Sequence, residues 1–148
     1  MSTGDCVIVS LADQGFGIPV AHIRDVLRRQ PTTPVPLAPR AIAGLINLRG
    51  RIVTAIDLRA RLGLPRREDG ADATDVVVEQ AGELYALIVD AVGDVVQIAE
   101  ERLEHVPARL DPAWRELATA VYPSERGLVV LLDVARLLDL APKLRAAS

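Results

Sequence analysis

Short apolar runs rich in valine, isoleucine and leucine alternate along the chain with brief polar, glycine- or proline-containing segments. Runs of this length and composition, bounded by turn residues, predict β-strands. The first two predicted strands cover residues 6–11 and 16–20, and Asp13-Gln14-Gly15 is expected to form the hairpin turn between them. The pattern therefore indicates a chain built mainly of β-structure.

Two further hairpins follow from the same pattern. The remaining predicted strands cover residues 44–48, 51–56, 75–79, 84–89, 92–98 and 127–132. Arg49-Gly50 is the expected turn of one hairpin, and Ala81-Gly82 is the centre of the other. Residues 102–117 fit no single pattern, and residues 116–121 are compatible with one more strand.

Helices are expected to be few and short. Apolar positions 23, 26 and 27 have helical spacing, which predicts a short helix over residues 21–29. Four prolines make residues 31–39 an extended loop. Asp57 and Asp133 each follow an apolar strand and precede an amphipathic segment, so we expect them to cap helices over 58–62 and 134–140.

The chain also repeats itself loosely. Residues 16–27 resemble 85–96 at an offset of 69, and residues 51–58 resemble 127–134 at an offset of 76. Chance similarity among short aliphatic strands is the alternative explanation. Each half, of about 70 residues, is too small to bury much surface alone. The repeat therefore predicts two small β units that share a hydrophobic interface, with their boundary near residues 66–74.

Composition limits the function. The 148 residues include 17 basic and 20 acidic ones, a net charge of −3, which argues against binding nucleic acid or inserting directly into a membrane. One cysteine, Cys6, and no recognisable signal peptide favour a cytoplasmic protein. We expect residues 1–4 to be disordered and residues 142–148 to be flexible.

Catalytic signals are missing from the sequence. Asp57, Asp90 and Asp133 could in principle serve a small hydrolase, but helix capping and a strand-end turn account for them more simply. His22 and His105 have no partner at metal-ligand spacing. We therefore expect no catalytic, metal or cofactor site and no enzymatic activity.

The segment Ile46-Asn47-Leu48-Arg49-Gly50-Arg51-Ile52-Val53 is unusual for a hairpin, because an arginine stands at its tip. Such an arginine could pair with a carboxylate of a partner or of the protein itself, or simply be solvated. Gly44-x-x-Asn47-Leu48-Arg49-Gly50-x-Ile52-Val53-x-x-Ile56-Asp57-Leu58-Arg59 resembles the central motif of the CheW family, the coupling proteins of bacterial chemotaxis. The resemblance extends over most of the chain and suggests a CheW-like domain over residues 5–141.

The resemblance implies an all-β fold with short helices, in which two intertwined five-stranded SH3-like β-barrels share one hydrophobic core. It also implies a non-catalytic adaptor that couples chemoreceptors, the methyl-accepting chemotaxis proteins, to the histidine kinase CheA. The implied partners are receptor cytoplasmic tips, the regulatory domain of CheA, and other CheW-like domains in rings. Receptor arrays would recruit the protein to the inner face of the membrane. A CheW-like scaffold of a non-flagellar pathway, for pilus motility or development, is the alternative.

The same resemblance suggests the residues of a binding site. Arg49 matches the motif arginine associated with receptor and kinase coupling, and Asp25 matches an acidic position that is usually glutamate. The other candidates are Ile23 and Val26 for a receptor groove, Gly44 near the kinase contact, and the motif residues Asn47 and Gly50. The chain departs from the family pattern at Thr54, where proline is frequent, and at Arg28-Arg29.

Overall fold

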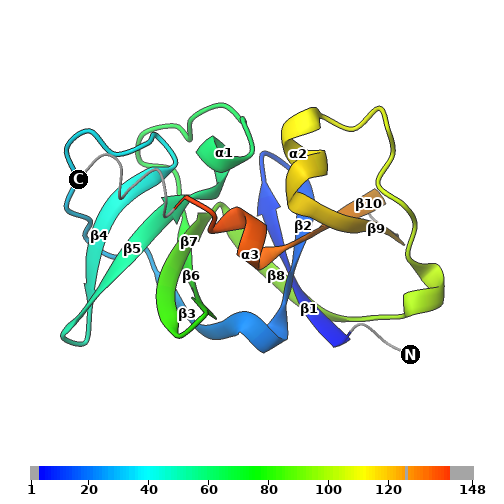
Figure 1. Ribbon diagram of the computed structural model, residues 1–148, viewed down its shortest axis with the longest axis horizontal. Coiled ribbons are helices and arrows are strands. Elements are labelled where there is room, and N and C mark those ends of the chain that lie inside the picture. The colour runs from blue at the N-terminus through cyan, green and yellow to red at the C-terminus, as the bar shows by residue number, and fades with distance from the viewer. Residues whose placement is uncertain (1–3, 126, 141–148) are drawn as a thin grey trace.

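The computed structural model describes residues 4–125 and 127–140, which form two five-stranded sheets lying side by side (Figure 1). The first sheet has the order β8-β1-β2-β10-β9, and the second has the order β3-β6-β7-β5-β4. The strands of the first sheet are β1 (Gly4–Leu11), β2 (Gln14–Pro19), β8 (Ala91–Ile98), β9 (Ala118–Ser124) and β10 (Gly127–Leu132). Those of the second are β3 (Ile23–Arg28), β4 (Ile42–Leu48), β5 (Arg51–Asp57), β6 (Thr74–Gln80) and β7 (Glu83–Val89).

Each sheet combines strands from both halves of the chain. Strands β1 and β2 pair with β8, β9 and β10, whereas β3, β4 and β5 pair with β6 and β7. The two orders become identical when β1 to β5 are exchanged for β6 to β10, so the repeat in the sequence corresponds to a repeat in the structure. The predicted fold of two intertwined five-stranded units is confirmed. Among the described residues, the ladder remains open between the two edge strands of each sheet.

Alternate side chains of the strands pack on opposite faces of each sheet. On β10, Val130 and Leu132 belong to a large cluster between the sheets, whereas Val129 and Leu131 belong to a smaller cluster of the first sheet. Strand β7 divides its side chains in the same way between the large cluster and a smaller one of the second sheet. The predicted shared core is confirmed, and each sheet has in addition a small core of its own.

Three of the hairpins turn through two-residue loops with positive φ at both positions. These loops are Ala12-Asp13, Arg49-Gly50 and Ala81-Gly82, with φ between 50° and 87°. Both angles positive is the arrangement whose twist suits an antiparallel hairpin. The second and third loops lie where the sequence predicts them. The first lies one residue earlier than predicted, because Gln14 already belongs to β2.

The helix predicted over residues 21–29 is wrong. The 3₁₀ turn η1 (Val20–His22) leads into strand β3, which pairs antiparallel with β6. The misleading pattern has a structural cause, since Val26 on β3 faces solvent with 43% of its surface exposed while its neighbour Asp25 is half-buried. A strand with a polar residue on its inner side and an apolar one outside lacks the usual alternation.

The remaining helices are short. They are α1 (Leu58–Arg61), the 3₁₀ turn η2 (Glu100–Arg102), α2 (Pro112–Leu117) and α3 (Val134–Leu137). The predicted caps are confirmed: Asp57 accepts a hydrogen bond from the Arg59 N–H at 3.0 Å, and Asp133 accepts one from the Arg136 N–H at 3.1 Å. Both helices end earlier than predicted. Disorder is predicted for residues 1–4, but Gly4 begins β1, and residues 1–3 lie outside the described residues. The predicted flexibility of residues 142–148 also falls outside the described residues.

Asp90 holds the crossover from the second sheet to the first. It lies between β7 and β8, where its N–H donates to Ser10 O at 3.1 Å and its Oδ2 accepts from the Ala12 N–H at 2.9 Å. Arg59 of α1 binds both carboxylate oxygens, and Arg67 Nε donates to Oδ1 at 2.8 Å. Burial alone would raise the pKa of Asp90, but these donors outweigh it and lower the pKa to about 2.

Replacing Asp90 should therefore destabilise the fold in a pH-dependent way. Because the native pKa lies below the unfolded value, the carboxylate stabilises the protein above about pH 4, and this contribution disappears as the pH falls toward 2. For Asp90→Asn we expect a loss of about 2 kcal/mol at pH 7 and a flatter stability profile below pH 4. Urea unfolding across this range measures both effects. Asp72→Asn, in the exposed loop before β6, is the matched control, and an equal loss in both variants would contradict the role of Asp90.

Candidate functional site

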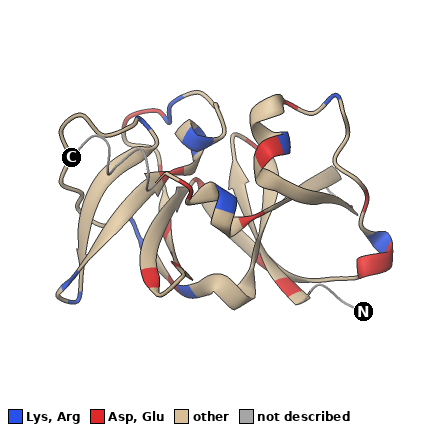
Figure 2. Cartoon of the chain, in the orientation of Figure 1, with Lys and Arg blue, Asp and Glu red and all other residues tan. Residues whose placement is uncertain are grey.

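The β4–β5 hairpin presents the unusual arginine at its tip. Leu48 pairs with Arg51, so Arg49 and Gly50 alone make the turn. The Asn47 side chain completes it, because its Oδ1 accepts a hydrogen bond from the Gly50 N–H at 2.8 Å. The motif residues Asn47 and Gly50 thus shape the turn, while the Arg49 side chain is 83% exposed. Figure 2 shows basic residues gathered at this tip.

Arg49 and Asp25 meet although they come from opposite edges of the second sheet. Strands β3 and β4 are its edge strands, and Arg49 Nη2 lies 3.7 Å from Asp25 Oδ2. We call the junction of these edges the second-sheet seam. The other carboxylate oxygen of Asp25 accepts a hydrogen bond from the Val26 N–H at 2.9 Å. An exposed pair at this distance contributes about 0–1 kcal/mol, so both charges remain available to a partner.

Aliphatic side chains accompany this charged pair. Val26 on β3 is 43% exposed and Ile52, which pairs with Asn47 in the hairpin, is 66% exposed. Ile23 instead packs against the shared core, so it supports β3 more than it forms a surface. Ile52 was not among the predicted site residues. The sequence gives no signal for it, because Arg51 and Ile52 are neighbours on β5 and both exposed, whereas strand alternation predicts that one of the two is buried.

Gly44 has a backbone role. It is buried, its φ is +149°, and a Cβ at this position would lie 2.2 Å from the carbonyl oxygen of Thr33. The close approach lets Thr33 form a two-hydrogen-bond bridge with Leu45, each at 2.8 Å. Only glycine accommodates the two segments so close together. Gly44 therefore positions the strand that leads into the hairpin, and its predicted place near a kinase contact stays a prediction.

The unusual Arg28-Arg29 pair has a structural explanation. Arg28 is exposed, whereas Arg29 Nη1 lies 3.1 Å from both carboxylate oxygens of Asp75, which is fully buried on β6. Burial raises the pKa of Asp75, and the Gln30 N–H and Arg29 partly counter that rise. Arg29 also donates to Thr32 Oγ1 at 2.6 Å. This partly buried pair anchors the loop that approaches Gly44.

The polar residues considered for catalysis have structural roles here. Asp57 and Asp133 cap helices, and Asp90 is held by two arginines. Cys6 is buried, and burial, with a smaller contribution from Asp5, raises the pKa of its thiol to about 11. Within residues 4–125 and 127–140, no group of three or more histidine, cysteine, aspartate or glutamate side chains could hold a metal ion. The arrangement suits recognition of another molecule by charge and apolar contact.

Comparisons with known proteins agree with this geometry. The family model described as "CheW-like domain" matches residues 5–141. The chain is 27% identical over 139 residues to "Probable chemotaxis protein CheW" of Rhizobium etli, covering 93% of this chain and 90% of that protein. It is 28% identical over 140 residues to "Chemotaxis protein CheW" of Bacillus subtilis, covering 94% and 90%.

A solved structure is similar over nearly the whole length. The crystal structure of the scaffolding protein TtCheW from Thermoanaerobacter tengcongensis matches with a TM-score of 0.84 and 28% sequence identity, and the match covers 97% of each chain. The two chains therefore share one fold over nearly their whole length.

The backbone role of Gly44 leads to a stability test. In Gly44→Ala the new Cβ meets Thr33 O, so we expect the free energy of unfolding to fall by about 2–4 kcal/mol. Gly82→Ala is the matched control: its φ is also positive, at +81°, but nothing lies within 4 Å of the added Cβ. The control should lose only about 1 kcal/mol. Chemical denaturation compares the two, and similar losses would show that close packing against Thr33 is unimportant.

Proposed function

Because this chain belongs to the CheW-like domain family, whose members are scaffolds of bacterial chemotaxis, we propose that it couples chemoreceptor cytoplasmic tips to the regulatory domain of the histidine kinase CheA. The chain is thus a chemotaxis adaptor by family, and the identity of its two partners is the proposed step. The observation that carries this step is the second-sheet seam, where an exposed Arg49–Asp25 pair stands beside exposed aliphatic side chains.

The composition of the seam suits docking of a helical protein tip. A helix laid in a groove needs apolar anchors surrounded by a polar rim. Val26 and Ile52 provide exposed aliphatic surface, and Arg49 and Asp25 provide one charge of each sign. A loose pair is suited to exchange, because each charge can turn toward a partner without leaving a buried ion behind.

The adaptor acts by binding alone in this proposal, without catalysis or a cofactor. Its place is the cytoplasm, where receptor arrays recruit it to the inner face of the membrane and other CheW-like domains join it in rings. Among the described residues, the helices are too short and too polar to span a bilayer.

Removing the positive charge of Arg49 should weaken partner binding while leaving the stability of the fold nearly unchanged. In Arg49→Ala we expect binding to a receptor-tip fragment or to the kinase regulatory domain to weaken about tenfold, or about 1.4 kcal/mol. Stability should change by less than about 0.5 kcal/mol, because the side chain is exposed. Calorimetric titration measures binding, and urea unfolding measures stability. Arg51→Ala, an exposed arginine of the same hairpin, is the control. Unchanged binding to both partners by a folded Arg49→Ala protein would refute the proposed site.

Lengthening the acidic partner should tighten the seam. Asp25→Glu adds one methylene, which lets the carboxylate close the present 3.7 Å separation from Arg49 to hydrogen-bond distance. A double-mutant cycle with Arg49→Ala should then give a coupling energy that rises toward about 1 kcal/mol at low salt. The gain should vanish in about 1 M salt, where the Debye length is about 3 Å. A coupling energy equal to that of the aspartate protein would show that side-chain reach does not limit the pair.

A further inference from the structure

The internal repeat gives the first sheet a counterpart of the candidate site. Strand β8 corresponds to β3, and the β9–β10 hairpin corresponds to the β4–β5 hairpin. The sequence offset of 69 relates Asp94 to Asp25. At the hairpin tips, the Ser124–Gly127 pair corresponds to the Leu48–Arg51 pair, so Glu125 occupies the position of Arg49. We call the junction of β8 and β9 the first-sheet seam.

At the hairpin tip of this seam, the charge has the opposite sign to that at the second-sheet seam. The second-sheet seam pairs Arg49 with Asp25, whereas the first-sheet seam has two acids, Glu125 and Asp94, both exposed. Neither acid takes part in an ion pair within the part of the chain that the structure describes. Two carboxylates repel each other, so this seam has no charged pair to draw its edges together.

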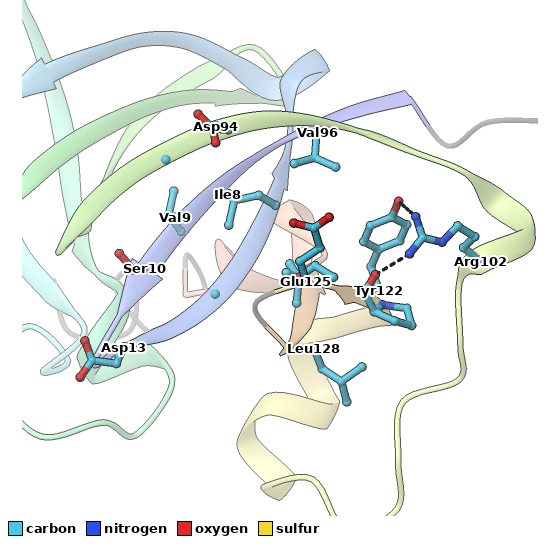
Figure 3. Close-up of a pocket in the computed structure, with 15 residues that line it drawn as sticks. Ile8, Val9, Ser10, Asp13, Asp94, Val96, Arg102, Tyr122, Glu125 and Leu128 are labelled. Carbon is cyan, nitrogen blue, oxygen red and sulfur yellow. Dashed lines mark hydrogen bonds between the residues drawn. The ribbon is translucent and has the colours of Figure 1, made fainter.

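A groove of about 590 Å³ lies at the first-sheet seam, and its lining is more apolar than polar (Figure 3). Ile8, Val96 and Leu128 supply aliphatic surface, and Leu128 is 44% exposed. Asp94 of β8 and Glu125 of the β9–β10 turn also line the groove. Arg102 also lies at the groove, but its guanidinium is bound to residues of β9. Its guanidinium donates to Tyr122 OH and to Pro123 O, each at 3.0 Å, and lies 4.9 Å from the centre of the Tyr122 ring.

The two edge strands differ in what they can offer a ligand. On β9, Val121 already exchanges two hydrogen bonds with Glu104, at 2.9 and 3.0 Å, and Pro123 has no N–H to donate. On the other side, β8 pairs with β1, and no described strand pairs with its outer edge. An exposed strand edge recruits extended peptides through main-chain hydrogen bonds.

From the groove, its charge and this edge, we infer that the first-sheet seam is a second docking site, which takes an extended partner segment whose groove-facing residues, at every second position, include both aliphatic and basic ones. The segment adds to the edge of β8, its aliphatic side chains cover Ile8, Val96 and Leu128, and its basic side chains meet Asp94 and Glu125. This site stands apart from Arg49, so the adaptor can hold a basic segment while its hairpin binds elsewhere.

A peptide-binding experiment tests the inference. The probe is a short fluorescein-labelled peptide in which leucine and arginine alternate at every second position, with serine between them, so that both face the groove. Its binding to the full chain is measured by fluorescence anisotropy. We expect saturable binding at least about tenfold tighter than that of the matching leucine–glutamate peptide. Asp94→Asn combined with Glu125→Gln should weaken binding of the arginine peptide about five- to tenfold. Glu68→Gln combined with Asp72→Asn, which removes the same charge from an exposed loop outside the groove, should leave it unchanged.

Two further arms locate the binding. A peptide methylated on alternate backbone nitrogens should lose affinity if pairing with β8 carries the contact, and Arg49→Ala should have no effect if the two seams are separate. Equal affinity for the arginine and glutamate peptides, or equal losses in the two double variants, would overturn the inference. Sedimentation that shows self-association abolished only by the groove variant would also overturn it, because the occupant would then be a second copy of the chain.

Discussion

The apolar layer shared by the two sheets determines the rest of the structure. Strands β1, β7 and β10 contribute alternate side chains to it and use remaining ones for the small core of their own sheet. With both faces covered, little of a central strand remains for recognition. The polar and charged side chains that could bind a partner therefore lie at the edges of the sheets, at the hairpin tips and at the crossovers. The exchange of strands between the halves makes this layer obligatory, because neither half forms a complete sheet alone.

Local sequence was enough to predict most elements of this fold. The hairpin turns, the two aspartate caps and the aliphatic strands each depend on residues close together in the chain, and propensity acts at that range. Strand β3 was predicted as a helix because only part of its apolar residues face the core. Ile23 packs against the shared core, whereas Val26 is exposed and Asp25 is only partly buried, so apolar positions 23, 26 and 27 imitate helical spacing. The helix prediction failed at the second-sheet seam, where the residue pattern suits an exposed surface instead of the usual strand alternation.

The site could be predicted only in part for a related reason. Arg49 is conspicuous at a hairpin tip, but nothing local shows that Asp25 lies across the seam, and only the family resemblance brought the two together. Arg29 and Asp75 are 46 residues apart, and a partly buried ion pair at that separation leaves no periodic pattern in the sequence. The structural role of Gly44 could not be predicted locally either, because the need for glycine arises from the carbonyl of Thr33 on a neighbouring segment. Contacts between distant segments follow from topology, which the aliphatic pattern leaves open.

The two seams show how such a fold can acquire a second specificity at small cost. A charge pair exposed to water interacts with an energy of about 1 kcal/mol at about 4 Å, against a total stability of about 5–15 kcal/mol for a domain. Exchanging the arginine of one hairpin tip for the glutamate of the other therefore hardly affects folding, because the shared apolar layer fixes the backbone. It reverses the sign of charge that a partner meets. A duplicated scaffold with an exchanged core can thus keep its shape while its two seams diverge in what they bind.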